Sequence, residues 1–295
     1  MIAPSAGATY DDLVRAAARA LPGSATPMLD ARILVAHAAG FDAATLIAEA
    51  RTPAPPAICE RTLAGVARRA AAEPVAYIVG EKEFRGLTFR MRPGVLVPRP
   101  DSETLIDALE ALRPDRDGAL CVLDLGVGSG ALLAATLAAY PNANGLGVDL
   151  SEGAARLAAE NARALGLAGR MAIAVGDWAA PVGAPFDVIL ANPPYIPDAD
   201  QPTLAPDVRD YEDPRALFAG PDGLDAYRRI VASLPDVLAA DGLALVEVGY
   251  GQAGAATALA RAHLPGAEVS MRADLAGVDR VICLDFAPRK DRPRA

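Results

Sequence analysis

From Asp101 to Phe286 the chain alternates between short apolar segments and longer segments with helical spacing. A strand, a helix and a second strand in succession form a parallel pair whose connecting helix covers the sheet. Only the short loop at residues 273–280 joins the last two strands, so this pair is expected to be antiparallel. The pattern predicts an α/β fold: a doubly wound, seven-stranded, mostly parallel sheet whose last strand is antiparallel. The strands are expected near residues 119–125, 144–150, 170–176, 186–191, 242–249, 268–273 and 280–286.

The part of the chain before this alternation has a different pattern. Residues 1–72 are rich in Ala, Leu and Arg with helical spacing, which predicts a small helical domain. Residues 73–100 contain three short β-like pieces, Tyr-Ile-Val-Gly, Leu-Thr-Phe-Arg-Met and Val-Leu-Val-Pro, and predict a β-hairpin linker. The domain with the sheet is then expected over residues 101–288, and residues 289–295 are expected to form a disordered tail.

Composition limits the location and the partners of the protein. The chain starts with no basic, apolar leader, and its most apolar stretch, residues 119–140, contains Asp124 and three glycines. We therefore predict a cytoplasmic protein that does not enter a membrane. We also expect a monomer. A net charge of −9 disfavours nucleic acid as a direct partner. His37 and His263 are not clustered with Cys or carboxylate residues, so no metal site is expected.

A glycine-rich loop follows the first predicted strand of the sheet and opens a helix. It comprises Gly126, Val127, Gly128, Ser129 and Gly130, and Asp149 ends the next strand. Such glycines let the backbone approach a ligand closely, and a carboxylate at the second strand can bind both ribose hydroxyls of an adenosyl group.

Two cofactors remain possible for this loop at this point, because the same residues also satisfy the dinucleotide pattern G-x-G-x-x-G/A. Asp124, two residues before the first glycine, favours a sulfonium cofactor, since its charge would repel a pyrophosphate. The loop therefore favours S-adenosylmethionine over a dinucleotide.

The sequence Asn192-Pro193-Pro194-Tyr195 leaves the carboxyl end of the strand predicted at 186–191. Ligands of open α/β sheets bind at this edge. The Asn192 oxygen and the Pro193 carbonyl can accept both N–H groups of a planar amide or aniline-like nitrogen, a poor nucleophile that must be oriented toward the methyl donor. Two prolines stiffen the segment, and Tyr195 offers a flat face for stacking. These residues predict a methyltransferase that acts on such a nitrogen.

Further segments make the resemblance more specific. The glycine loop and Asn192–Tyr195 resemble those of Class I methyltransferases. Over residues 10–286 the chain is similar to bacterial peptide-chain release factor glutamine methyltransferases. The segments that carry this similarity are residues 80–89, 95–103, 207–214, 217–224 and 274–280.

This resemblance implies the Class I methyltransferase fold and transfer of a methyl group from S-adenosylmethionine to the side-chain amide nitrogen (N5) of the glutamine in the GGQ motif of release factors. It implies cofactor contacts at residues 126–130, Asp149, Trp178 and Asn192, with Trp178 beside the adenine. Asn192–Tyr195 would bind the substrate glutamine, and Asn192 and Tyr195 would serve catalysis. We expect the helical domain at 1–72 to recognise the release factor. Val127 is a departure, since the family commonly has Thr there.

Two other substrates fit the same residues. Glutamine methylation of a ribosomal protein would use the same pocket. Adenine-N6 methylation of nucleic acid follows the same chemical logic, but it would require a basic face or a recognition domain that the sequence does not suggest.

Overall fold

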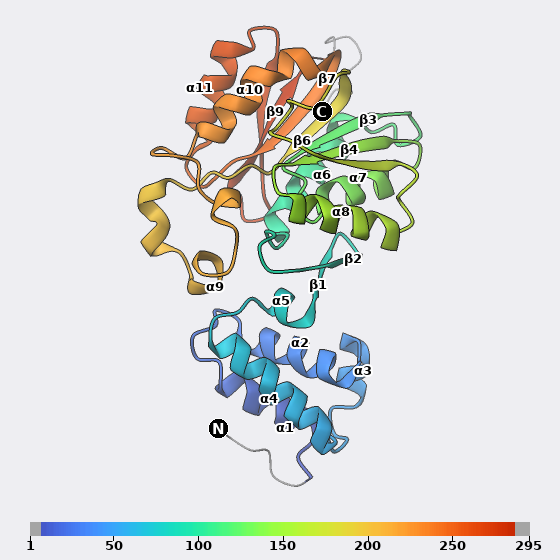
Figure 1. The fold of residues 1–295 in the computed structure, drawn as a ribbon, viewed down its shortest axis with the longest axis vertical. Coiled ribbons are helices and arrows are strands. Elements are labelled where there is room, and N and C mark those ends of the chain that lie inside the picture. Colours follow the sequence, from blue (N-terminus) through green and yellow to red (C-terminus); the bar gives the residue numbers. More distant parts are fainter. Residues whose placement is uncertain (1–6, 287–295) are drawn as a thin grey trace. The chain divides into compact units, whose positions relative to one another are not determined.

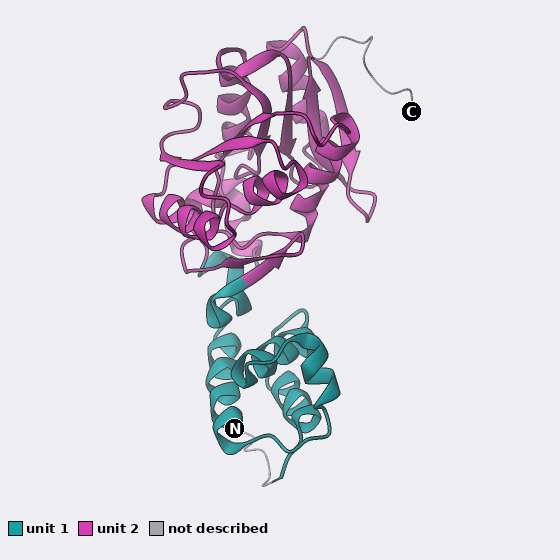
Figure 2. Cartoon of the chain, turned by 90° about the vertical axis from the view of Figure 1, so that its right-hand side faces the viewer, with its two compact units in different colours: residues 1–81, 205–211 teal, residues 82–204, 212–295 magenta. Residues whose placement is uncertain are grey.

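The computed structural model describes residues 7–286, which form two compact units (Figure 2). Unit 1 comprises Met1–Glu81 and Ala205–Tyr211, and unit 2 comprises Lys82–Leu204 and Glu212–Ala295. The chain thus leaves unit 2 after Leu204, contributes seven residues to unit 1 and returns. The predicted domain boundaries stay predictions, because compactness alone does not delimit a functional domain. The tail expected at 289–295 lies outside the described residues.

Unit 1 is a bundle of short helices. Thr9 and Asp12 begin the first helix with a reciprocal capping box, in which the Thr9 hydroxyl accepts from the Asp12 amide at 3.2 Å and the Asp12 carboxylate accepts from the Thr9 amide at 3.0 Å. Leu13, Leu34 and Val35 are buried in its core. The helices are α1 (Tyr10–Arg19), α2 (Pro27–Ala39), α3 (Ala43–Ala48), α4 (Pro56–Ala70), α5 (Val75–Val79) and α9 (Pro206–Arg209).

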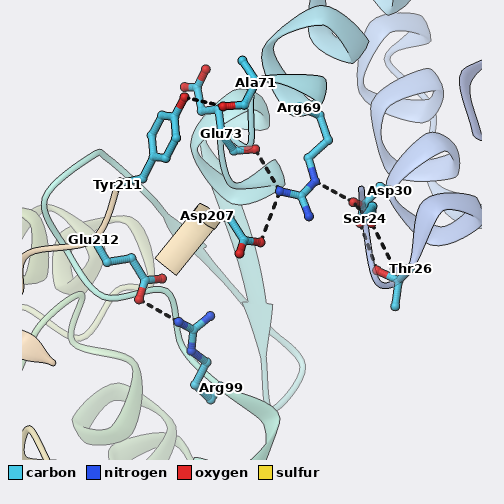
Figure 3. A network of polar contacts seen from close by, with 10 residues as sticks. All are labelled: Ser24, Thr26, Asp30, Arg69, Ala71, Glu73, Arg99, Asp207, Tyr211 and Glu212. Carbon is cyan, nitrogen blue, oxygen red and sulfur yellow. Dashed lines mark hydrogen bonds and ion pairs between the residues drawn. The ribbon is translucent and has the colours of Figure 1, made fainter. Parts of the chain in front are cut away.

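A buried arginine organises the inserted residues 205–211 within unit 1. The Arg69 Nε donates to Asp30 at 2.7 Å, and its Nη1 lies 3.2 Å from the Asp207 carboxylate (Figure 3). The Tyr211 hydroxyl donates to the Ala71 carbonyl at 2.9 Å. Because Arg69 and Asp30 are largely shielded from water, removal of either partner would leave the other charge buried without compensation, which is costly.

The linker expected at 73–100 is only partly β-structured. Pro74 starts helix α5 and Gly80 ends it in the left-handed conformation, so the Tyr-Ile-Val piece is helical rather than a strand. A two-stranded sheet follows, formed by β1 (Glu81–Phe84) and β2 (Leu87–Arg90). The Val-Leu-Val-Pro piece is not a strand, although Val95 and Val97 are buried. Burial of these side chains, rather than strand pairing, explains their apolar character.

Unit 2 contains the seven-stranded sheet that the sequence predicts, in the order β5-β4-β3-β6-β7-β9-β8. β9 runs antiparallel to both β7 and β8, and the other adjacent pairs are parallel, which confirms the predicted fold class. The strands are β3 (Cys121–Leu125), β4 (Asn144–Asp149), β5 (Met171–Val175), β6 (Phe186–Ala191), β7 (Leu238–Glu247), β8 (Glu268–Ala273) and β9 (Asp279–Asp285).

Helices cover both faces of this sheet (Figure 1). One apolar cluster contains side chains of α6, α7 and α8, and a second contains those of α10 and α11. These helices are α6 (Glu103–Leu112), α7 (Ala131–Ala139), α8 (Glu152–Ala164), α10 (Asp225–Val237) and α11 (Ala253–His263). Three short 3-10 helices lie at Pro100–Ser102, Asp198–Thr203 and Pro214–Ala216.

The topology brings three loops together at the carboxyl edge of the sheet. Leu125 at the end of β3 pairs with Val148 in β4 and with Ala191 in β6. The residues that follow these positions are therefore neighbours, and the chain order reverses between β3 and β6, where open α/β sheets bind ligands. Over residues 7–286 no helix is long and apolar enough to cross a membrane.

Candidate functional site

A cavity of about 410 Å³ opens at this edge of unit 2. Its volume falls in the range of ordinary small-molecule sites. Eight of the residues proposed from the sequence line it. They are Gly126, Val127, Gly128, Ser129, Asp149, Trp178, Asn192 and Pro194.

The glycine loop adopts the turn that its sequence predicts. Gly126, Gly128 and Gly130 all have positive φ, at 82°, 55° and 85°. A Cβ on Gly130 would lie 2.9 Å from the Met171 methyl and 3.3 Å from Ala158 Cβ. Gly130 does not line the cavity, so in this structure it serves the turn and the close packing against α8.

Asp149 lies beside this loop, held by two backbone amides. One carboxylate oxygen accepts from Gly128 N–H at 2.9 Å and the other from Ser151 N–H at 2.8 Å. Burial raises the pKa of Asp149, while these two hydrogen bonds partly offset the rise. Each oxygen retains a second lone pair, so the carboxylate can still accept from two ligand hydroxyls.

Trp178 forms part of the cavity wall. It has φ of 53°, a conformation rare for a large side chain, and a Cβ added to Gly126 would lie 3.8 Å from its ring. Both residues line the cavity, and the indole offers it a flat apolar face. The neighbouring Asp177 pairs with Arg229, and both also line the cavity.

Asp124, at β3, is 1% exposed and does not line the cavity. Its expected contact with the cofactor stays a prediction. Within the described residues neither carboxylate oxygen of Asp124 has a hydrogen-bond partner. Burial, followed by the charge of Asp149, raises the pKa of Asp124 to about 7.

Only some residues of the Asn-Pro-Pro-Tyr segment line the cavity. Asn192 and Pro194 line the cavity, whereas Pro193 is buried and Tyr195 is not among the lining residues. The Tyr195 hydroxyl is 3.5 Å from Glu247, a long contact, and its backbone carbonyl accepts from Gln252 at 2.8 Å. Burial raises the pKa of Tyr195 to about 12, so its hydroxyl stays protonated.

Several lining residues were not proposed from the sequence. Ser102 is 3% exposed, and its hydroxyl accepts from Asn192 Nδ2 at 2.8 Å. Asp213 and Arg215 form an ion pair with each other and also line the cavity. A serine before a helix is ordinarily explained as a helix cap. The resemblance of residues 95–103 to a known family was therefore the only feature of the sequence that could have placed Ser102 in the site.

Known proteins share both the sequence and the fold of this chain. Residues 12–80 match the family model described as the PrmC N-terminal domain, and residues 87–206 match the methyltransferase small domain. A release factor glutamine methyltransferase of Rhodospirillum rubrum is 46% identical over 232 residues, covering 78% of this chain and 70% of that protein. One of Bradyrhizobium diazoefficiens is 43% identical over 256 residues, 86% of each chain. The chain belongs to the release factor glutamine methyltransferase family.

As a member of the release factor glutamine methyltransferases the chain is an enzyme that transfers methyl groups, and the resemblance stated from its motifs is confirmed. A solved methyltransferase of Pyrococcus furiosus, 16% identical with a TM-score of 0.51, covers 69% of this chain and 90% of its own. At that identity it supports the fold alone.

Proposed function

We propose that this enzyme transfers a methyl group from S-adenosylmethionine to the side-chain amide nitrogen of the GGQ glutamine in a peptide-chain release factor. The observation that carries the proposal is the position of Asn192. It lies in the cavity wall with the glycine loop and Asp149, and its Nδ2 is bonded to Ser102 at 2.8 Å. Its oxygen Oδ1 is therefore available to accept from an amide N–H. The names of the relatives support a release factor as the substrate.

The residues around the cavity fit an adenosyl group with a positively charged sulfur. Asp149 supplies acceptors for two ribose hydroxyls, Trp178 supplies a flat face, and the glycine loop (residues 126–130) allows close approach of the backbone. When bound, the cofactor supplies an electrophilic methyl group. Asp149 also brings negative charge to a cavity that would hold a cation.

Asn192 would orient the glutamine amide by accepting one N–H, and the Pro193 carbonyl would accept the other. These contacts strengthen as the nitrogen gains positive charge, so they favour the transition state over the bound substrate. In such a transfer the nitrogen would form its new bond to the methyl carbon as the carbon–sulfur bond breaks, and it would then lose a proton to solvent. We retain Pro194 as a rigid wall of the pocket and Tyr195 as a stacking residue.

Selection of one glutamine requires binding energy away from the reacting atom. We assign this to the helical residues 1–72, which would contact the folded release factor, and place the reaction in the cytoplasm. We expect the enzyme to act as a monomer.

The test is mass spectrometry of a purified release factor after incubation with the enzyme and S-adenosylmethionine. We expect a gain of one methyl group on the GGQ glutamine. A release factor with Asn in place of that glutamine is the matched control and should remain unmodified. Methylation of a ribosomal protein or of adenine in DNA, with the release factor unmodified, would contradict the proposal.

A further inference from the structure

A buried chain of hydrogen bonds connects Asn192 to a carboxylate that no catalytic role has yet explained. The Ser102 hydroxyl donates to Glu247 Oε2 at 2.6 Å and accepts from Asn192 Nδ2 at 2.8 Å. Ser102 is 3% and Glu247 1% exposed, so water does not compete for these bonds. The three residues come from the segment before α6, the end of β6 and the end of β7.

Ser102 occupies the N-cap position of α6 but makes no capping hydrogen bond there. A serine at this position ordinarily accepts from the amides of the first turn. Here the hydroxyl is turned toward Glu247 and Asn192 instead, so capping does not explain its placement.

The number of hydrogens on Glu247, Ser102 and Asn192 fixes which group donates in each of these bonds. An ionised carboxylate only accepts, and a serine hydroxyl carries one hydrogen. With that hydrogen given to Glu247, Ser102 offers only lone pairs to Asn192. The Asn192 side chain must then present its NH₂ group to Ser102 and its oxygen to the opposite side.

We propose that Glu247 and Ser102 are positioning residues that fix the orientation of the Asn192 amide, so that Oδ1 rather than Nδ2 faces the substrate nitrogen. The inference rests on the proposed function, in which Asn192 accepts a hydrogen bond from the glutamine amide. Were the Asn192 amide reversed, its NH₂ group would face the NH₂ group of the substrate, two donors without an acceptor.

The charge of Glu247 controls this arrangement. A protonated Glu247 can donate to Ser102, which can then donate to Asn192 Oδ1, reversing every bond. Burial raises the pKa of Glu247 to about 7, while the hydrogen bond from Ser102 and the charge of Arg280 act against the rise. The other groups that act on it are Asp101, which raises its pKa, and Tyr195, which lowers it; Tyr227 donates to its backbone carbonyl.

Kinetics on the release factor test the positioning role. Ser102→Ala should lower kcat about tenfold or more, with the affinity for S-adenosylmethionine changed less than about twofold. Ser102→Thr retains the hydroxyl and should restore kcat to within about threefold of the parent. Thr136→Val removes a buried hydroxyl outside the site and serves as the control, with parental kcat expected. A kcat in Ser102→Ala within about twofold of the parent would overturn the proposal.

The pH dependence separates positioning from a merely structural role. In the parent, kcat should fall as the pH is lowered from about 8 to about 6, as Glu247 becomes protonated. Glu247→Gln cannot titrate and should lose this fall. An identical pH profile in both proteins would contradict the role given to Glu247.

A measurement without substrate keeps the inference distinct from the proposed function. The Asn192 side-chain amide can be observed by ¹⁵N NMR in the free enzyme and assigned by its loss in Asn192→Ala. Its signals should shift between about pH 6 and about pH 8 in the parent and not in Glu247→Gln. Failure to methylate a release factor would refute only the function, whereas a parental amide signal that ignores pH would refute the control of the Asn192 orientation by the charge of Glu247.

Discussion

Gly147 in β4 lies against Val127 of the glycine loop. Gly147→Ala should disturb the packing between them. A Cβ at this position would lie 2.5 Å from Val127 Cγ2 and 2.9 Å from Val127 Cβ, closer than real contacts allow. Val127 is 4% exposed and β-branched, so it cannot rotate away freely. β4 cannot shift either, because Gly147 pairs with Asp124 on one side and Ile173 on the other.

The size of the effect follows from overpacking. Such insertions into a packed core cost about 1–3 kcal/mol, so we expect Gly147→Ala to lower the unfolding free energy by about 2 kcal/mol. Val127→Ala removes two methyl groups and should cost a further 2 kcal/mol or so on its own. In the double variant the 2.5 Å contact with Val127 Cγ2 is gone, and only the 2.9 Å contact with the retained Cβ has to relax. The loss of stability of the double variant should therefore be about 1–3 kcal/mol smaller than the sum of the two single losses.

Urea unfolding of the four proteins measures this coupling, and calorimetry measures binding of S-adenosylmethionine. Binding should weaken in Gly147→Ala and recover in part in the double variant. Gly169→Ala is the matched control, since a Cβ there meets nothing within 4 Å, and it should change stability by less than about 0.5 kcal/mol. Single losses that add to within about 0.5 kcal/mol would refute the proposed contact between Gly147 and Val127.

Three further predictions concern the site. Asp149→Ala should weaken S-adenosylmethionine binding by about 1–3 kcal/mol through lost charge-assisted bonds, and unchanged affinity by calorimetry would remove Asp149 from the site. Asn192→Ala should lower kcat/KM about a hundredfold or more, and single-turnover transfer at saturating cofactor within a fewfold of the parent would show that it does not orient the amide. Burial raises the pKa of Asp124 from 3.8 to about 7, so its contribution to stability is present below about pH 4 and is lost as the pH rises through about 7. The unfolding free energy should fall between about pH 4 and about pH 7, and that of Asp124→Asn should fall less; equal slopes would contradict the assignment.

Local pattern was sufficient to predict the framework of this protein. The alternation of apolar and helical segments after Asp101 predicted all seven strands of the sheet and the antiparallel end at β9. The glycine loop, Asp149 and Asn192 could be placed at one edge because parallel strands align their carboxyl ends. These inferences depend on the spacing of neighbouring residues, which backbone geometry translates directly into structure.

The tertiary structure alone decided which distant side chains meet. Ser102 and Glu247 are 145 positions apart, and Ser102 and Asn192 are 90 apart, so no local pattern links them. The same holds for residues 205–211, which join unit 1 through Arg69 although they follow the Asn-Pro-Pro-Tyr segment in sequence.

Burial also placed some side chains in surroundings that their sequence context does not predict. Asp124 faces the interior rather than the cavity, Gly130 packs against α8, and Tyr195 turns toward Glu247. In each case the strand or turn was predictable from its neighbours, whereas the direction and surroundings of the side chain depended on how the helices and loops pack over the sheet. Periodicity determines the backbone path, but only packing between remote segments determines which polar groups lose water and must bond to one another.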